Sequence, residues 1–224
     1  MYGRHSEAFY SAIANPAPDF DEDDSRGYAL FTDVTMRALE QKAIAFVQSP
    51  RNVDAALTVL TTSVDVQQRR GAAWLLSYGP DPRQTAAVLA AALDDPDADV
   101  RNTASRELAV LADYGLGNPA LKVRIPPGRV IQMLNSVIWT DRDKALAVLD
   151  PLTVARDTET LAQLKHSGLA SLEEMARWNA ASYARMAYQL IGRIAGLTDA
   201  DIEKTWNDGN AARKRIITAA NQRR

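Results

Sequence analysis

The sequence predicts an all-α protein built from pairs of helices joined by short turns. Three observations lead to this prediction: apolar residues recur at helical spacing from residue 33 onward, aspartate and proline mark the turns, and no stretch strongly demands a strand. The chain has 224 residues, of which 46% are hydrophobic and 24% charged. It is therefore long enough for one elongated domain or two small ones with a substantial core.

The clearest turn lies between residues 93 and 100. An apolar helix ends near Leu93, and the segment Asp94-Asp95-Pro96-Asp97 follows it. Proline lacks an N–H and clashes with the preceding helical turn, so it breaks the helix. A second helix is expected to begin near Asp97 or Asp99, because an aspartate side chain can accept hydrogen bonds from the first N–H groups of a helix. Its apolar face holds Val100, Ala104, Leu108 and Leu111.

This segment resembles a HEAT repeat, the armadillo-like helical hairpin, in its terminal leucine, its Asp-Pro turn, the Val100-Arg101 start and the inward Ala104 and Leu108. The same residues recur at an offset of 32, which places Arg101 over Arg69, Ala104 over Ala72 and Leu108 over Leu76. The resemblance implies a right-handed α–α superhelix. Its regular hairpins would span about residues 32–113, and degenerate hairpins with a helical C-terminal cap would span about residues 126–224.

Residues 1–31 are expected to form a separate N-terminal part, with a helix at residues 1–14 and an acidic linker, so that residues 32–224 form the repeat domain. The acidic run of residues 19–24 is expected to be solvated and irregular. Asp19, Asp21 and Asp23 have the spacing of the start of an EF-hand loop, but Asp24 and Leu30 stand where that loop needs a glycine and a carboxylate. A linker is the favoured interpretation, and binding of a cation stays open.

The other helices follow from the same apolar spacing. Asn52 is the expected cap of the third helix, Asp141 or Asp143 that of the helix at residues 144–149, and Thr198 that of the helix at residues 199–206. A short extended link is expected at residues 121–125. The helices are expected at residues 33–49, 52–60, 67–78, 83–93, 97–113, 126–139, 144–149, 157–166, 169–179, 181–195, 199–206 and 211–222.

Composition excludes or disfavours several classes of function. The formal charge of -2 disfavours a general nucleic-acid binder, and the absence of cysteine excludes disulfides and thiolate chemistry. No apolar run is long enough to span a bilayer, and the first residues lack an apolar signal region. We therefore expect no membrane association and a cytoplasmic protein, or an exported one whose signal peptide has been removed. The two histidines, His5 and His166, belong to no paired ligand motif, so neither a metal nor another cofactor is expected.

The resemblance implies that the second helix of each hairpin lines a concave partner-binding side. The predicted contact residues are Arg70, Trp74 and Ser77 on one helix and Asn102, Ser105 and Arg106 on the next. Trp74 beside Arg106 would form an amphipathic contact point, since tryptophan and arginine are enriched at binding hot spots. The competing interpretation, that Trp74 is core or packs under the N-terminal segment, is slightly favoured. Arg69 and Arg101 are interpreted as structural residues paired with Asp65 and Asp97.

Three functions fit these features. The favoured one is a non-catalytic scaffold for a protein or peptide partner, because no catalytic motif stands out. The resemblance also admits an enzyme on a HEAT-like frame, such as a glycosylase for alkylated DNA bases or a lyase that attaches bilin pigments. A third is a structural subunit that stacks on another copy through an uncapped end. The basic residues 213–215, 223 and 224 are opposite in sign to the acidic run, and the two stretches could dock on one another within a chain or between chains, or the basic tail could contact an anionic partner. A solvated terminal helix is the favoured interpretation of that basic stretch.

Overall fold

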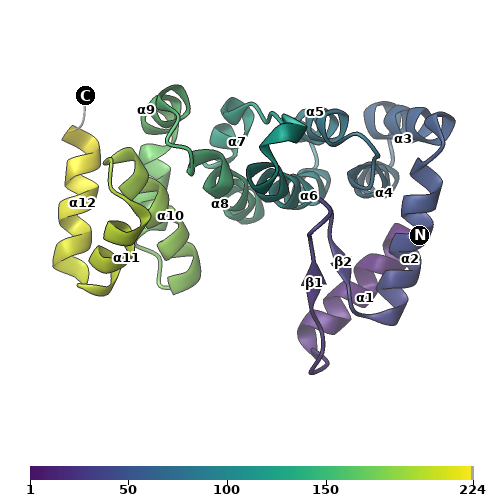
Figure 1. The fold of residues 1–224 in the computed structure, drawn as a ribbon, viewed down its shortest axis with the longest axis horizontal. Coiled ribbons are helices and arrows are strands. Elements are labelled where there is room, and N and C mark those ends of the chain that lie inside the picture. Colours follow the sequence, from purple (N-terminus) through teal and green to yellow (C-terminus); the bar gives the residue numbers. More distant parts are fainter. Residues whose placement is uncertain (223–224) are drawn as a thin grey trace. The chain divides into compact units, whose positions relative to one another are not determined.

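The computed structural model describes residues 1–222, in which twelve α-helices make up nearly all of the regular structure (Figure 1). The prediction of an all-α chain of helical hairpins is confirmed. The chain divides into two compact units, Met1–Ile125 and Pro126–Arg224. The predicted boundary at residues 31 and 32 stays a prediction. No helix within residues 1–222 has the length and apolar character that crossing a membrane requires.

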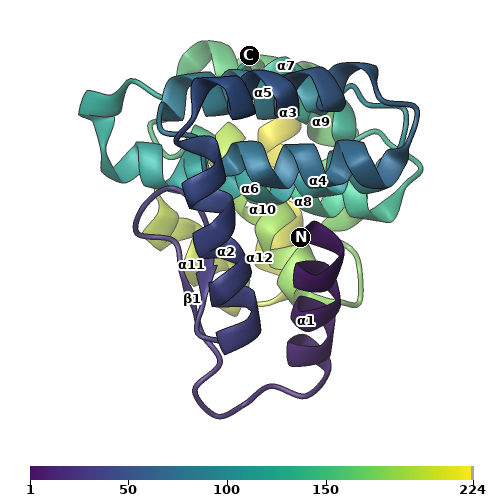
Figure 2. The ribbon, with the colours of Figure 1, turned by 90° about the vertical axis from the view of Figure 1, so that its right-hand side faces the viewer.

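The first unit is organised around α4 (Val66–Ser77). The hairpin partner of α4 is α3 (Pro50–Thr62), and the next hairpin consists of α5 (Pro82–Ala92) and α6 (Ala98–Gly117). Figure 2 shows α3 and α5 in one layer and α4 and α6 in the next. The helices α1 (Tyr2–Ala14) and α2 (Val34–Val47) contact α4 as well. They lie on the side of α4 that faces away from α3 and α5 (Figure 2).

Local capping explains where most of these helices begin. An aspartate side chain accepts a first-turn N–H at the start of α2, α4, α5 and α6. The cap of α6 is Asp97, and Asp99 lies inside its first turn. The expected cap Asn52 is wrong: α3 begins at Pro50, which needs no partner for an N–H, and Asn52 donates from Nδ2 to the Phe46 carbonyl oxygen at 2.8 Å.

Part of the acidic run is more regular than expected. The strand β1 (Glu22–Asp23) pairs antiparallel with β2 (Leu30–Phe31), with Glu22 opposite Phe31 and Asp23 opposite Leu30. The side chains of Leu30 and Phe31 are buried, whereas those of Glu22 and Asp23 are exposed. Burial therefore fixes β2, and the acidic residues pair along its outer edge.

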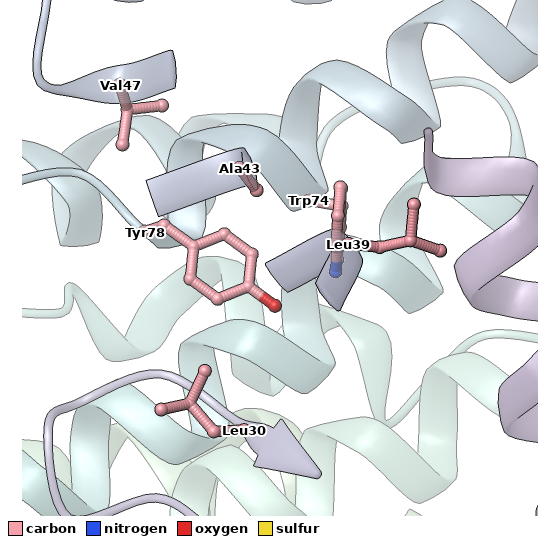
Figure 3. Packing of buried hydrophobic residues seen from close by; sticks show 6 residues of the cluster. All are labelled: Leu30, Leu39, Ala43, Val47, Trp74 and Tyr78. Atoms are coloured by element: carbon pink, nitrogen blue, oxygen red, sulfur yellow. The ribbon is translucent and has the colours of Figure 1, made fainter. Parts of the chain in front are cut away.

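The core of the first unit joins the hairpins to the N-terminal segments. Trp74 and Tyr78, from α4 and its C-cap, lie among side chains of β2 and α2 (Figure 3). Their rings meet edge to face, with centroids 5.3 Å apart. The offset of 32 residues is also reflected in the packing, because each member of its two apolar pairs is buried: Ala72, Ala104, Leu76 and Leu108.

The predicted partners of Arg69 and Arg101 are wrong, although both arginines have a structural role. Arg69 binds Asp95 in the α5–α6 turn through two hydrogen bonds of 2.7 and 3.0 Å, and Arg101 donates to the Asp95 carbonyl oxygen at 2.7 Å. Asp65 and Asp97 cap helices instead. One aspartate thus connects arginines from two successive hairpins.

The second unit holds six helices: α7 (Pro127–Met133), α8 (Trp139–Thr153), α9 (Thr158–Met175), α10 (Ala181–Ile194), α11 (Asp199–Asn207) and α12 (Asn210–Gln222). Helix α10 is central, since it contacts α8, α9, α11 and α12. The core contains buried side chains from α7 through α10, among them Val130, Leu146, Leu149, Leu164, Leu172 and Ile191.

Several predicted boundaries in and near this unit are wrong. Helix α6 continues through Gly115 to Gly117 instead of ending at residue 113. Helix α7 ends at Met133, and α8 begins at Trp139, so neither Asp141 nor Asp143 is its cap. Asp141 is buried and accepts a hydrogen bond from the Ser136 hydroxyl at 2.7 Å. The link at residues 121–125 is preceded by a 3-10 turn, Pro119–Leu121.

The two helices predicted at residues 157–166 and 169–179 form the single helix α9, and Gly168 in this helix allows close packing. A Cβ atom at this position would lie only 2.9 Å from Leu134 Cδ1 and 3.0 Å from Leu164 Cδ1. Glycine lowers helix propensity, yet α9 continues through this position. In the structure, this glycine lets α9 approach the end of α7 closely.

Candidate partner-binding sites

The six predicted contact residues lie on the adjacent helices α4 and α6, and we call them the α4–α6 strip. Trp74, Ser77 and Ser105 are buried, with exposed fractions of 1%, 3% and 0%, whereas Arg70, Asn102 and Arg106 are half-buried. The two serines donate to carbonyl oxygens of their own helices, which satisfies them locally. The strip therefore exists as a contiguous surface, but only its three outer side chains are partly open.

The N-terminal helix α1 lies on this strip. Arg70 Nη2 donates to Tyr2 Oη at 3.1 Å, and the guanidinium lies 5.3 Å from the Tyr2 ring centroid. The rings of His5 and Trp74 are 4.8 Å apart, and the Arg106 guanidinium lies 4.1 Å above the Phe9 ring. The favoured interpretation of Trp74, that it packs under the N-terminal segment, is confirmed. A partner-binding role for the strip stays a prediction.

A buried polar contact between His5 and Glu40 connects α1 to α2. His5 Nε2 lies 2.9 Å from Glu40 Oε1, and the exposed fractions of these two side chains are 1% and 0%. Glu40 also accepts a hydrogen bond from the Phe31 backbone N–H at 3.1 Å, so one carboxylate connects α1, α2 and β2. Sequence reasoning missed this group. The available signal was the position of Glu40 between Met36 and Ala43 on the apolar face of α2.

A second buried carboxylate, Glu107 on α6, lies close to the strip. Burial raises the pKa of this group, and the nearby charge of Arg106 opposes that effect without cancelling it. Arg106 Nε is 3.8 Å from Glu107 Oε1, and Oε2 has no hydrogen-bond partner among residues 1–222. The charged form is thus poorly compensated in the folded chain.

Replacing Glu107 by glutamine should stabilise the protein at neutral pH. Because the folded pKa is raised, the stability of the wild-type chain falls as pH rises from the unfolded value of about 4.3 through the folded value. E107Q removes this loss, so we expect a free energy of unfolding higher by roughly 1 kcal/mol at pH 7.5 and no gain at pH 4. Urea denaturation at both pH values measures it. The exposed Glu7 provides the control, since E7Q should change neither value.

The second unit contains a groove with a different chemistry. It has a volume of about 680 Å³ and lies between the segment after α9, the start of α10, the end of α11 and α12. Its lining includes the cations Arg177, Arg213 and Lys214 and no carboxylate. Trp178 and Trp206 also line it, and both are half-buried. We call this surface the basic groove.

Arg213 is held firmly in the basic groove. Its guanidinium stacks 3.7 Å from the Trp206 ring centroid, and its Nε and Nη2 atoms donate to the Trp206 carbonyl oxygen at 3.0 and 2.8 Å. Trp178 belongs to an aromatic cluster with Trp139, at a centroid distance of 5.4 Å. The sequence indicated a solvated helix for residues 213–215, and only the fold brings this segment next to Trp178.

The acidic and histidine side chains form no metal-binding arrangement in the described part of the chain. Within residues 1–222, no three or more His, Cys, Asp or Glu side chains converge in a way that could hold a metal ion. His5 is buried between α1 and the strip, and His166 is exposed on α9.

Comparison with known proteins identifies the fold. No protein-family model matches the chain, and no curated protein matches its sequence. Solved structures do match it. A designed armadillo-repeat protein in complex with the peptide (KR)4 is 13% identical with a TM-score of 0.50, over 83% of this chain and 91% of that chain.

Two further solved structures agree with this match. Computationally designed armadillo-repeat proteins for modular peptide recognition are 14% identical with a TM-score of 0.51, over 83% of this chain and 92% of that chain. An engineered protein is 16% identical with a TM-score of 0.52, over 85% of this chain and 91% of that chain. The chain therefore has an armadillo-like helical-repeat fold, and the resemblance drawn from residues 93–111 is confirmed.

Proposed function

We propose that this protein is a non-catalytic interaction scaffold that binds a peptide or helical segment of a protein partner through the α4–α6 strip. Solved proteins of similar fold include one in complex with a peptide and others designed for peptide recognition. Repeat folds of this type build extended surfaces from the inner helices of successive hairpins. The proposal is supported by the position of the strip residues on the second helices of two successive hairpins, α4 and α6.

The observation that carries the proposal is the way α1 lies on the strip. Its contacts come from residues far away in the sequence, since 101 positions separate Tyr2 from Thr103, whose hydroxyl groups lie 3.1 Å apart. These contacts are specific: two arginines meet the faces of two aromatic rings, and a histidine ring packs on Trp74. The strip thus already accommodates one helix.

The chemistry of α1 describes the partner that the strip would accept. Tyr2, His5 and Phe9 face the strip from positions i, i+3 and i+7 of one helix. This spacing is that of an amphipathic helix lying in a groove. The partner segment would present aromatic side chains at the same spacing to Arg70, Trp74 and Arg106, and it would compete with α1 for the strip.

A peptide with the sequence of residues 1–14 provides the test. In the wild-type chain, α1 competes at the high effective concentration of a tethered segment. The variant Y2A/F9A loses the two aromatic contacts of α1, so we expect it to bind the labelled peptide at least about tenfold more tightly than the wild-type chain does. Fluorescence anisotropy measures both dissociation constants.

Two controls make this result specific. The variant I13A alters an exposed position of α1 and should bind the peptide as weakly as the wild-type chain. A peptide that itself carries Y2A and F9A should lose its affinity for the Y2A/F9A chain. Equal affinities for the two peptides would show that the strip does not recognise these aromatic side chains, and the proposal would then be wrong.

A further inference from the structure

We propose that the basic groove of the second unit binds the acidic run, residues 19–24, of another copy of this chain. This interaction surface is separate from the α4–α6 strip and does not depend on the function proposed for it. The inference is based on the charges of the groove, on the charges of the run and on the shape of each.

Two of the three cations in the groove have no anionic partner in the described part of the chain. Within residues 1–222, neither Arg213 nor Lys214 has a carboxylate oxygen within 4.0 Å. Arg177 pairs with Glu173 at 3.3 Å, but the Arg177 side chain is 64% exposed, and exposed pairs of this kind contribute little. Because Arg213 is already fixed by Trp206, it loses little side-chain freedom when an anion binds. An anionic segment is therefore the ligand that this groove favours.

The acidic run has anions without cationic partners. Residues 19–24 contain five carboxylates, and in the described part of the chain none of them has a cationic nitrogen within 4.0 Å. Asp21 and Asp23 accept hydrogen bonds from the nearby backbone N–H groups of Glu22 and Ser25, which orders them without neutralising them. The pairing of β1 with β2 holds part of the run extended and exposed.

Size and composition also agree. A volume of about 680 Å³ is in the range of sites that take several residues or a small ligand. The groove adds the apolar surfaces of Trp178 and Ile217 to its three cations, and these suit the backbone and side-chain stems of an extended segment. Each chain carries one groove and one run, so the contact is heterologous and generates a ring or an open chain of copies.

Sedimentation equilibrium of the full chain tests the proposal. We expect the apparent mass to rise with protein concentration in low salt and to return to that of a monomer at high salt, because an interaction between exposed charges is screened. A mass that stays monomeric at every concentration in low salt would overturn the proposal. So would an oligomer that persists at high salt.

Charge-reversal variants identify the two surfaces. R177E/K214E reverses two exposed cations of the groove, and D19K/D24K reverses two carboxylates of the run that form no side-chain hydrogen bond in the described structure. Each variant should weaken self-association at least about tenfold. The matched control is K204E/R215E, which makes the same charge change on α11 and α12 outside the groove, and it should associate like the wild-type chain.

The combined variant is the decisive one. A chain with R177E, K214E, D19K and D24K keeps the formal net charge of -2 and exchanges the signs at two positions of the groove and two positions of the run. Because the four exchanged positions again carry opposite signs, it should associate more tightly than either double variant. Failure of the combined variant to associate would contradict the pairing, and so would a loss of association in K204E/R215E as large as in R177E/K214E.

Discussion

Replacing Trp74 by alanine should lower the free energy of unfolding of the first unit by about 3–5 kcal/mol. The Trp74 side chain is only 1% exposed, and its ring contacts those of Tyr2, His5 and Tyr78. The substitution removes a large apolar side chain from the point where α1, α2 and α4 meet (Figure 3). Denaturant unfolding followed by far-UV circular dichroism measures the loss.

Two further variants give this measurement its meaning. W74F keeps one aromatic ring in the cavity, so we expect a smaller loss, about 1–2 kcal/mol. W139A removes a tryptophan that is 44% exposed and should cost clearly less than W74A. If W74A changed the stability by less than about 0.5 kcal/mol, Trp74 would behave as a surface residue, and the burial of the strip under α1 would be wrong.

Replacing Arg193 by alanine should destabilise the second unit by about 3 kcal/mol. This arginine is only 2% exposed, and its Nη1 donates to the Asp150 carbonyl oxygen at 2.6 Å and to the Thr153 hydroxyl at 2.8 Å. Its Nε donates to Asp199 at 3.1 Å. One guanidinium thus connects α10 to the last turns of α8 and the first turn of α11. Without it, the buried Thr153 hydroxyl and the Asp150 carbonyl oxygen lose a donor, and the half-exposed Asp199 carboxylate loses an ionic partner.

The effect of R193A should depend on pH. Burial alone would raise the pKa of Asp199, but the hydrogen bonds and charges of Arg193 and Arg156 outweigh it, so that this pKa is lowered. A carboxylate with a lowered folded pKa stabilises the fold above its unfolded pKa of about 3.9, and this contribution is lost as pH falls through the folded value. The difference between R193A and the wild-type chain should therefore be full at pH 6 and smaller below about pH 4.

A matched arginine on the same helix separates burial from charge. Arg185 bonds Glu203, but both side chains are about half exposed. R185A should therefore lower the free energy of unfolding by at most about 1 kcal/mol, because an exposed ion pair contributes little. Thermal unfolding at several pH values compares the two variants. An equal loss in R185A and R193A would contradict the structural role assigned to Arg193.

The sequence pattern identified local features well. It predicted a helix at residues 1–14, a start of α6 at Asp97 or Asp99, of which Asp97 is the cap, and the Thr198 start of α11, where Asp201 N–H donates to the Thr198 hydroxyl at 3.1 Å. These features depend on residues within a few positions of one another, so short windows of sequence contain the required information. The same reasoning placed six residues on two helices that are adjacent in the structure, because their spacing follows the helical repeat.

Features that depend on contacts between residues far apart in the sequence could not be predicted from short windows of sequence. The sequence pattern predicted two helices at residues 157–166 and 169–179, whereas the chain forms one helix, α9, in which Gly168 lies close to Leu134. Arg69 was assigned to Asp65, its neighbour in sequence, whereas it pairs with Asp95, which is 26 positions away. Local propensity favours one answer in each case, and packing between segments overrides it.

The sequence by itself therefore determined the class of fold, the order of most helices and the hairpin with armadillo-like character, because periodic apolar residues and capping side chains act locally. Only the tertiary structure decided that α1 lies on the α4–α6 strip and that His5 of α1 contacts Glu40 of α2. It also decided that Trp178, Trp206 and Arg213 border one groove. The physical reason is that these contacts join surfaces whose complementary shape and charge arise only after the helices have packed.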